Sequence, residues 1–476
     1  MRRSAPLWTV TCFLWLLAGC LERPGTPIGP EVGFGQQVSI DPGGVNAIDI
    51  LFVIDNSGSM YQEQENLAVQ IPALVRDLAS PPDRDGDGAP DWAAAESLRI
   101  AIANTDTGIG SVVIPGSRCM PGGDGGVLHG GVFEWNTGDD PDAFAAAVGS
   151  VVAGLGITGC GFEQQLEAAA VALELNATRG FPREDALLGI IVVTDEEDCS
   201  TEHDDSFFSA VDPRTYDVHC TRNAASLTPV ASLLERIRGD RTDDRIVFAA
   251  IAGVPVDLPA GATPAEILEL PDMQYRETAD LQLEPVCGDS DGLGEAAPAR
   301  RLVELASMLP GSVVTTICTD DFGPAIAEIA ARIGERIQGV CLARALPDTA
   351  DGAAPCEVFV HLPPGDRCDA VAAYGLHEID REGREVCSVT QVEPGASSGG
   401  WYYDPSDASC PRLVLTPDAQ PPLGAELTAE CFFHVLREFG EQCARGSQCK
   451  SGYCDLEAQV CAPLPEVPGG SGSPTG

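Results

Sequence analysis

The sequence is poor in basic residues. It has 28 lysines and arginines against 72 aspartates and glutamates, and its formal net charge is −44 over 476 residues. Nucleic-acid binding depends on Lys and Arg contacts to phosphates, so this balance argues against a nucleic-acid partner. It also argues against docking of the protein surface on anionic lipid. An acidic surface favours solubility and raises the local concentration of divalent cations.

Sequence signatures of the common enzymes are also missing. The chain contains no H-E-x-x-H and no G-x-x-x-x-G-K, and G-x-S-x-G occurs only at residues 288–292 and 395–399, neither of which directly joins a predicted strand to a predicted helix as a nucleophile elbow does. Its six histidines, His203 and His219 among them, are scattered and are expected to be surface or hydrogen-bonded polar residues. A phosphotransferase with Asp55 as nucleophile would need a second acid two residues on, where Ser57 stands. We therefore expect no enzymatic activity. A metal-assisted hydrolase is a remote alternative, because a metal without a placed base or nucleophile defines no reaction.

The N-terminal apolar run is too short to span a membrane, which takes about 20 apolar residues. Residues 5–17 follow Arg2 and Arg3 and lead into the letters LAGC, which end at Cys20. This pattern predicts a secretory signal. LAGC is similar to a bacterial lipobox, which implies cleavage before Cys20, acylation of that cysteine and a membrane anchor. An ordinary signal peptide with an incidental cysteine is the alternative. We expect an exported lipoprotein in the cell envelope, with the outer membrane as the favoured location.

The cysteine count agrees with export. Of 18 cysteines, Cys12 lies in the signal and Cys20 is the lipid site, which leaves an even number. An even set in an exported chain indicates disulfides, although the pairing does not follow from sequence.

Between residues 45 and 340, apolar strand-like runs alternate with helical patterns. The expected strands are 48–54, 98–104, 132–136, 187–194, 245–252 and 312–317. The expected helices are 62–78, 142–152, 162–175, 228–238, 299–309 and 324–338. This alternation predicts an α/β fold, a doubly wound and mainly parallel sheet with helices on both faces. The run 132–136 is the candidate for an antiparallel edge strand.

Beyond Cys341 the helical periodicity disappears. Short extended runs between Pro, Gly and Asp turns predict a small β module stapled by disulfides, with Gly400–Tyr403 as an aromatic cluster that serves as core or, alternatively, as a binding surface. Four more cysteines then follow closely, at Cys443, Cys449, Cys454 and Cys461; disulfides are the favoured use and zinc the alternative. We predict six segments: signal peptide 1–19, tether 20–44, α/β domain 45–340, β-rich module 341–433, Cys-rich segment 434–462 and disordered tail 463–476.

Three loops at predicted strand ends carry oxygen ligands. Asp55, Ser57 and Ser59 follow the strand that ends at residue 54, and Asp195 follows the strand that ends at residue 194. Thr158 lies in the loop before the third helix. The carboxyl edge of an open parallel sheet is where ligands bind, and hard oxygen ligands suit Mg2+. A plain helix N-cap is the alternative for Asp55 and the serines. The two further loops favour a metal site.

These loops resemble the metal-ion-dependent adhesion site of a von Willebrand factor type A domain. The likeness covers residues 47–339 and rests on DNSGSM, the threonine loop and TDEEDCS. In that family a D-x-S-x-S loop, a threonine and an aspartate hold Mg2+ or Mn2+, and a partner carboxylate completes the octahedron. The resemblance implies these roles for Asp55, Ser57, Ser59, Thr158 and Asp195. The family usually reads G-G-T-x-T-G before its helix, and this chain departs from that pattern around Thr158.

The resemblance implies a binding function, with a protein ligand that offers a carboxylate. Specificity would lie in the insertions 108–131, 200–218 and 255–287. The acidic run Glu196–Asp198 either adds to the cation site or, as favoured here, forms a solvated acidic loop. We expect Cys199 to pair with Cys220, and Cys119 with Cys160 as a second guess. A structural cell-envelope lipoprotein in which metal only stabilises the fold is the alternative function.

A second cation site is predicted at residues 83–91. Asp83, Asp85, Asp87 and Asp91 take positions 1, 3, 5 and 9 of an EF-hand calcium loop, with a glycine at position 6. The bidentate glutamate of position 12 is replaced by Ala94. A structural Ca2+ loop is favoured, and a plain acidic turn is the alternative.

Overall fold

The computed structural model describes most of the chain. The described residues are 33–40; 47–341 without 85, 87–89, 115–116, 185, 203–204, 213–214, 217, 260 and 289–293; 346; 354–434 without 406–410 and 423–424; 442; 454–455; and 458–462. The chain divides into two compact units, residues 36–431 and the combination of 1–35 with 432–476. The predicted signal peptide, Cys20 and the disordered tail lie outside the described residues.

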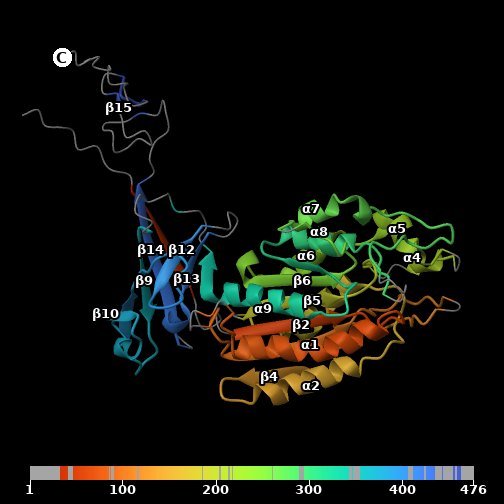
Figure 1. Ribbon diagram of the computed structural model, residues 1–476, viewed down its shortest axis with the longest axis horizontal. Helices are drawn as coiled ribbons and strands as arrows, with labels where there is room; N and C mark the ends of the chain where they lie inside the picture. The colour runs from red at the N-terminus through yellow and green to blue at the C-terminus, as the bar shows by residue number, and fades with distance from the viewer. Residues whose placement is uncertain are drawn as a thin grey trace, which may run out of the picture. The chain divides into compact units, whose positions relative to one another are not determined.

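A six-stranded sheet forms the centre of the α/β part (Figure 1). Its strands, in spatial order, are β4 (Val132–Asn136), β3 (Ser97–Asn104), β2 (Ala47–Ile54), β5 (Leu187–Val193), β6 (Ile246–Ala252) and β7 (Val313–Thr316). The pairs from β3 to β7 are parallel, and β4 pairs antiparallel with β3. The predicted α/β fold class and the antiparallel edge strand are confirmed.

Helices cover both faces of this sheet. One face packs against α1 (Tyr61–Ala79), α2 (Pro141–Ala153) and α9 (Gly323–Gln338). The other packs against α3 (Gln165–Ala177), α6 (Val230–Arg238) and α8 (Arg300–Met308). Figure 1 shows α6 and α8 on the side of the sheet opposite to α1 and α2. Every residue of β2, β5 and β6 is buried, as expected of parallel strands covered on both sides.

The insertions carry short helices: α4 (Asp205–Ser209), α5 (His219–Arg222) and α7 (Pro264–Leu268), with 3-10 turns η2 (Ala224–Ser226), η3 (Asp243–Arg245) and η4 (Pro271–Met273). The disulfide Cys287–Cys318 joins the last insertion to the loop after β7. In the described part of the chain, no helix combines the length and the apolar character that crossing a membrane requires.

The β-rich part contains two sheets. Their strand orders are β1-β14-β9-β11-β10 and β12-β13-β8. The strands are β1 (Gly33–Ile40), β8 (Gly339–Cys341), β9 (Cys356–His361), β10 (Tyr374–Ile379), β11 (Glu385–Val389), β12 (Trp401–Asp404), β13 (Arg412–Leu415) and β14 (Glu426–His434), with 3-10 turns η5 (Cys368–Ala370) and η6 (Pro417–Ala419). Disulfides Cys356–Cys431 and Cys368–Cys387 staple the first sheet.

Two details of this part bear on the predictions. Residues 33–40, expected to belong to a tether, form strand β1 and pair with β14. Trp401 is 1% exposed and donates from Nε1 to the carbonyl of Val389 at 3.1 Å, so the centre of the aromatic cluster is core.

In the Cys-rich segment, β15 (Cys454–Asp455) pairs with β16 (Val460–Cys461), and Cys461 is disulfide-bonded, which favours staples over zinc. Cys443 and Cys449 lie outside the described residues.

Candidate metal centre

Asp55 is fixed at the carboxyl end of β2. Its backbone N–H donates to the carbonyl of Val193 at 2.9 Å, which continues the β2–β5 pairing by one residue. Its Oδ1 accepts the backbone N–H of Ser57 at 2.7 Å, and its Oδ2 accepts the hydroxyl of Thr194 at 2.7 Å. The side-chain amide of Gln64, in the first turn of α1, donates to the Asp55 carbonyl at 2.8 Å. Asp55 is fully buried, so its carboxylate has a single defined orientation.

The predicted hydroxyl ligands gather around it. The Oγ atoms of Ser57 and Ser59 lie 2.9 Å apart. Ser59 also hydrogen-bonds to the side chain of Asp195, which lies two residues after the end of β5. The structure therefore brings together four of the five predicted residues: an aspartate and two serines from one loop and an aspartate from the next strand end.

The loop that carries Thr158 packs through its backbone against the loop of Asp55, Ser57 and Ser59. The N–H of Gly159 donates to the carbonyl of Asn56 at 2.8 Å. A Cβ on Gly159 would lie 2.1 Å from Asn56 Oδ1, so only glycine permits this approach. The Thr158 side chain is exposed, and no hydrogen bond joins it to any other described residue. Its role as a ligand stays a prediction.

A third carboxylate, that of Glu163, lies at the candidate site and was not predicted from the sequence. Glu163, two residues before α3, is 4% exposed. Burial and then the charge of Asp55 raise the pKa of Glu163 well above its usual range, and Glu196 and Asp195 add to the rise. Burial and then Asp55 likewise raise the pKa of Asp195, and burial raises that of Asp55. Three carboxylates are thus buried close enough to repel one another.

Two of these carboxylates have an oxygen without a partner. Glu163 Oε1 and Asp195 Oδ1 are buried and accept no hydrogen bond from any described residue. Neither they nor Asp55 forms an ion pair within the described part of the chain. Buried carboxylates are normally paired or bound to a metal. No group of three or more described His, Cys, Asp or Glu side chains is placed to hold a metal alone, so a cation at this place would also need the serine hydroxyls.

The prediction that the acidic run Glu196–Asp198 forms a solvated loop is wrong, because its last two residues cap helices. Glu197 accepts the backbone N–H groups of Arg300 and Arg301, at 2.7 and 3.1 Å, at the start of α8. The hydroxyl of Tyr275 also donates to it, and burial raises the pKa of Glu197 to about 7. Asp198 is fully buried, accepts the N–H of Leu166 in α3 at 3.0 Å, and pairs with Arg301 at 2.9 Å. Carboxylates at helix N-termini satisfy N–H groups that lack intrahelical partners.

Both expected disulfides near the site are confirmed. Cys119 pairs with Cys160, and Cys199 with Cys220. They close a small core of their own that packs Phe162, Phe207, Phe208 and Ile109 against the same cystines. The Cys199–Cys220 bond therefore closes the insertion at residues 200–218, and aromatic packing of Phe208 on Phe162 attaches the insertion to the loop before α3.

Acidification is expected to weaken this small core through His219. Its Nε2 lies 3.2 Å from the carbonyl of Phe207, while Nδ1 faces the amide nitrogen of Asn223 at 3.5 Å, so a proton on Nδ1 would meet a donor. Burial lowers the pKa of His219 below 6.5, so the unfolded chain takes up this proton first as the pH falls. The stability that depends on a neutral His219 is complete above pH 6.5 and is lost as the pH falls through the lowered pKa of the folded protein. Urea unfolding at pH 7.5 and 5.5 should show a loss in the wild type that is smaller in His219→Gln; equal losses would contradict the assignment.

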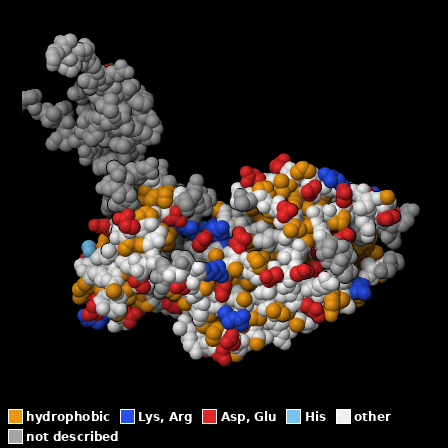
Figure 2. All heavy atoms as spheres, in the orientation of Figure 1, with side chains coloured by type: hydrophobic (Ala, Val, Ile, Leu, Met, Phe, Trp, Pro, Cys, Tyr) orange, Lys and Arg blue, Asp and Glu red, His pale blue; other side chains and the backbone are white. Residues whose placement is uncertain are grey.

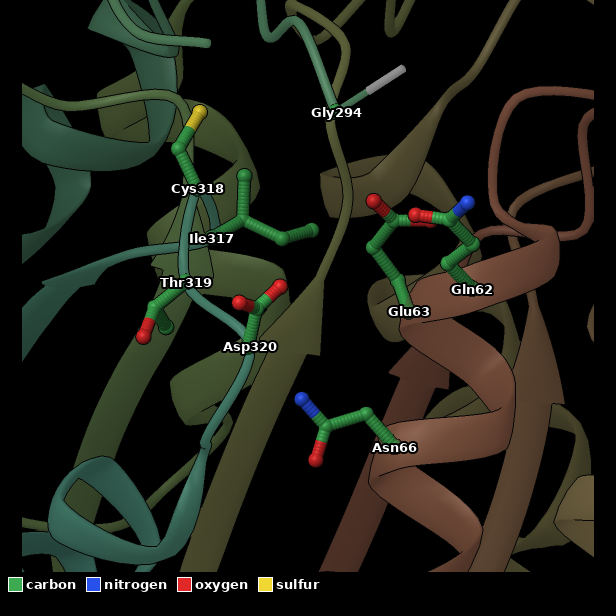
Figure 3. Close-up of a pocket in the computed structure, with 8 residues that line it drawn as sticks. All are labelled: Gln62, Glu63, Asn66, Gly294, Ile317, Cys318, Thr319 and Asp320. Carbon is green, nitrogen blue, oxygen red and sulfur yellow. The ribbon is translucent and has the colours of Figure 1, made fainter. Parts of the chain in front are cut away.

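A cavity of about 190 Å³ lies beside the site. One wall comes from the first turns of α1, with Gln62, Glu63 and Asn66, and the opposite wall from residues 317–320 after β7 (Figure 3). Glu63 also lies close enough to raise the pKa of Asp195. The carboxyl edge of the sheet therefore has a polar hollow next to the serine loop.

The predicted calcium loop is only partly described. Asp83 Oδ1 accepts the N–H of Gly86 at 2.7 Å, and Asp91 Oδ1 accepts the N–H of Arg84 at 3.1 Å. The Arg84 guanidinium lies 4.0 Å from Asp91 and 2.8 Å from Asp77. Asp85 and Asp87 lie outside the described residues. Calcium binding at this loop stays a prediction.

The surface agrees with the acidic composition. On the face shown in Figure 2, Asp and Glu side chains are spread over the described surface and do not form one patch. The acidic side chains on this face are solvated, in contrast to the buried carboxylates of the site.

No family model and no curated protein matches the chain. Similar solved structures include proximal thread matrix protein 1 from the mussel byssus, with 11% identity over 62% of this chain and 47% of that one (TM-score 0.27). Conserved hypothetical protein BatB from Bacteroides thetaiotaomicron has 12% identity over 61% of this chain and 98% of that one (TM-score 0.28). Manganese-loaded TRAP protein from Plasmodium vivax has 12% identity over 64% and 78% (TM-score 0.25). The chain spans about half of the mussel protein, at 47%. Likenesses this low carry no information on function.

Proposed function

We propose that the chain is a binding protein that holds a partner's carboxylate through a divalent cation at the carboxyl edge of its sheet. The cation would be Mg2+ or Mn2+, held by Asp55, Ser57, Ser59 and Asp195, with Glu163 as a further acidic group. It would supply a positive charge with an open coordination position, and this chain's residues would orient it.

The observation that carries the proposal is the pair of buried oxygens without partners on Glu163 and Asp195. Burying carboxylates beside Asp55 with no arginine or lysine paired to them costs free energy, which a cation would offset. The hydrogen-bonded serine loop supports the same site, because it presents two hydroxyl oxygens next to these carboxylates.

The sequence supports a family and a cellular location for the proposed binding protein. The D-x-S-x-S loop and the aspartate after β5 support membership of the von Willebrand factor type A family. The lipobox-like letters before Cys20 support export and a lipid anchor, and the disulfides of the described residues suit an oxidising compartment. We propose binding without catalysis, because the sequence lacks the enzyme signatures named above. The expected partner is a protein that offers a carboxylate.

A purely structural metal is the second candidate. It is favoured by the burial of Asp55, Asp195 and Glu163, since a cation there would stabilise the fold whether or not a partner binds. In that case the cation would have no coordination position left for a ligand.

Unfolding and binding measurements on the full chain distinguish the two. Thermal unfolding in EDTA and in Mg2+, Mn2+ or Ca2+ should show a metal-dependent rise in Tm in either case. Binding of a capped Gly-Asp-Gly peptide, with Gly-Asn-Gly as its uncharged match, should require the metal only if the function is binding. A rise in Tm without aspartate-specific binding would leave the structural role, and no rise in Tm would reject the metal site.

A further inference from the structure

Arg118 extends over the loop of the candidate site. Its Nη1 donates a hydrogen bond of 3.0 Å to the carbonyl of Ile157, in the loop before α3. The same nitrogen lies 3.9 Å from the point that a Cβ on Gly58 would occupy. Gly58 stands between Ser57 and Ser59, so the guanidinium lies beside the loop that presents both hydroxyls.

The neighbouring residue fixes this position. Cys119 is bonded to Cys160, and both cysteines are buried. Cys160 directly follows Gly159, whose N–H donates to Asn56 in the serine loop. A covalent bond therefore ties the segment of Arg118 to the backbone that packs on the site. Arg118 itself is exposed, which leaves its charged end at the rim of the site.

The charge of Arg118 has no carboxylate partner among the described residues, although acidic residues outnumber basic ones by 72 to 28. The hydrogen bond to Ile157 is the only one that its guanidinium makes within the same part of the chain. The remaining N–H groups are arranged in a planar fork that matches the two oxygens of a carboxylate. Arg118 is exposed, whereas Asp55, Asp195 and Glu163 are buried and none of them pairs with it.

We propose that Arg118 binds the partner's carboxylate together with the cation of the site. The assignment rests on the proposed function and defines its ligand: a carboxylate shared between the cation and the guanidinium. An amide of the same shape is not bound, because it offers a negative charge to neither group. A basic group next to the partner's carboxylate weakens binding, because Arg118 repels it.

The test uses the Mn2+-loaded full chain and water-proton relaxation, in which a carboxylate that displaces a metal-bound water lowers the relaxivity. Capped Gly-Asp-Gly is the probe and Gly-Asn-Gly its control. Arg118→Gln is expected to weaken Gly-Asp-Gly binding about ten- to a hundredfold without changing Mn2+ affinity. Arg118→Lys should keep only part of the wild-type affinity for Gly-Asp-Gly, since lysine retains the positive charge but lacks the planar fork of N–H groups. Arg179→Gln makes the same charge change just beyond α3 and should bind like the wild type.

Three outcomes would overturn the assignment. If Arg118→Gln binds Gly-Asp-Gly as tightly as the wild type, Arg118 does not contact the ligand. If the variant tightens Mn2+ binding and keeps the full preference for aspartate over asparagine, Arg118 only balances the acidic groups. If the wild type binds no Mn2+ or does not prefer Gly-Asp-Gly, the proposed function fails, and this assignment fails with it.

Discussion

Arg183→Ala is expected to lower the free energy of unfolding by about 3–5 kcal/mol, because it leaves a buried charge without a partner. Asp49 lies on β2 with a fully buried side chain, and burial raises its pKa, while Arg183 opposes that rise. The guanidinium of Arg183 donates from Nε to Asp49 at 2.9 Å and from Nη1 to Ser97 on β3 at 2.8 Å. One arginine thus joins two central strands at the amino edge of the sheet, opposite the candidate site. Urea unfolding would measure the loss.

Two further variants separate the buried charge from a general loss of packing. Arg76→Ala breaks an exposed pair with Asp142, 3.4 Å long, and should cost less than about 1 kcal/mol. Asp49→Asn in the Arg183→Ala background removes the unpaired charge and should recover part of the lost stability. A loss below about 1 kcal/mol for Arg183→Ala, in the range of the exposed pair, would show that Asp49 does not depend on this arginine.

The arrangement of strands and helices was predictable because burial on both faces leaves a simple pattern. Strand β5 is the continuous apolar run LLGIIVV, and all its residues are buried. Edge strand β4 is mostly exposed, and Trp135 is its one buried residue. The predicted start of α3 at residue 162 is wrong: the helix begins at Gln165, and Phe162 packs against Phe208 and Tyr216 outside the helix.

The candidate site was predictable where its residues are close in sequence. Asp55, Ser57 and Ser59 share one turn, and Asp195 follows an obvious strand, so the rule for parallel sheets places them together. Glu163 was missed because it lies in the stretch expected to be helical. Its side chain joins the site only because the chain before α3 is irregular. The available signal was an acid between Phe162 and an apolar helix, which is weak by itself.

Residues that depend on long-range contacts escaped sequence reasoning. Glu197 and Asp198 look like any solvated acidic run, and only the folded chain brings the N-termini of α8 and α3 to them. Strand β1 reads as part of a tether, since its partner β14 lies near the other end of the sequence. The position of Arg118 follows from the cystine next to it, and that pairing was a guess at the level of sequence.

Asp55→Asn is expected to remove the metal-dependent stability of the chain and to leave the metal-free protein at least as stable as the wild type. Asp55 and Asp49 are both buried on or next to β2, but Asp49 has Arg183, whereas Asp55 faces Asp195 and Glu163. Neutralising Asp55 therefore relieves repulsion, while an asparagine oxygen can still accept the N–H of Ser57. In Mg2+ at about 100 times the dissociation constant, the wild type should gain about 2.7 kcal/mol and the variant nothing.

A comparison with Asp49, near the other end of β2, makes the prediction for Asp55 specific. Asp49→Asn weakens the bond to Arg183 and should lower stability equally in EDTA and in Mg2+, because its partner is a side chain. Asp240→Asn makes the same charge change at an exposed position after α6 and should change stability neither in EDTA nor in Mg2+. A variant at Asp55 that keeps the Mg2+-dependent gain would place the cation elsewhere. A variant that loses stability in EDTA as Asp49→Asn does would show that the Asp55 carboxylate is held by hydrogen bonds alone, without need of a cation.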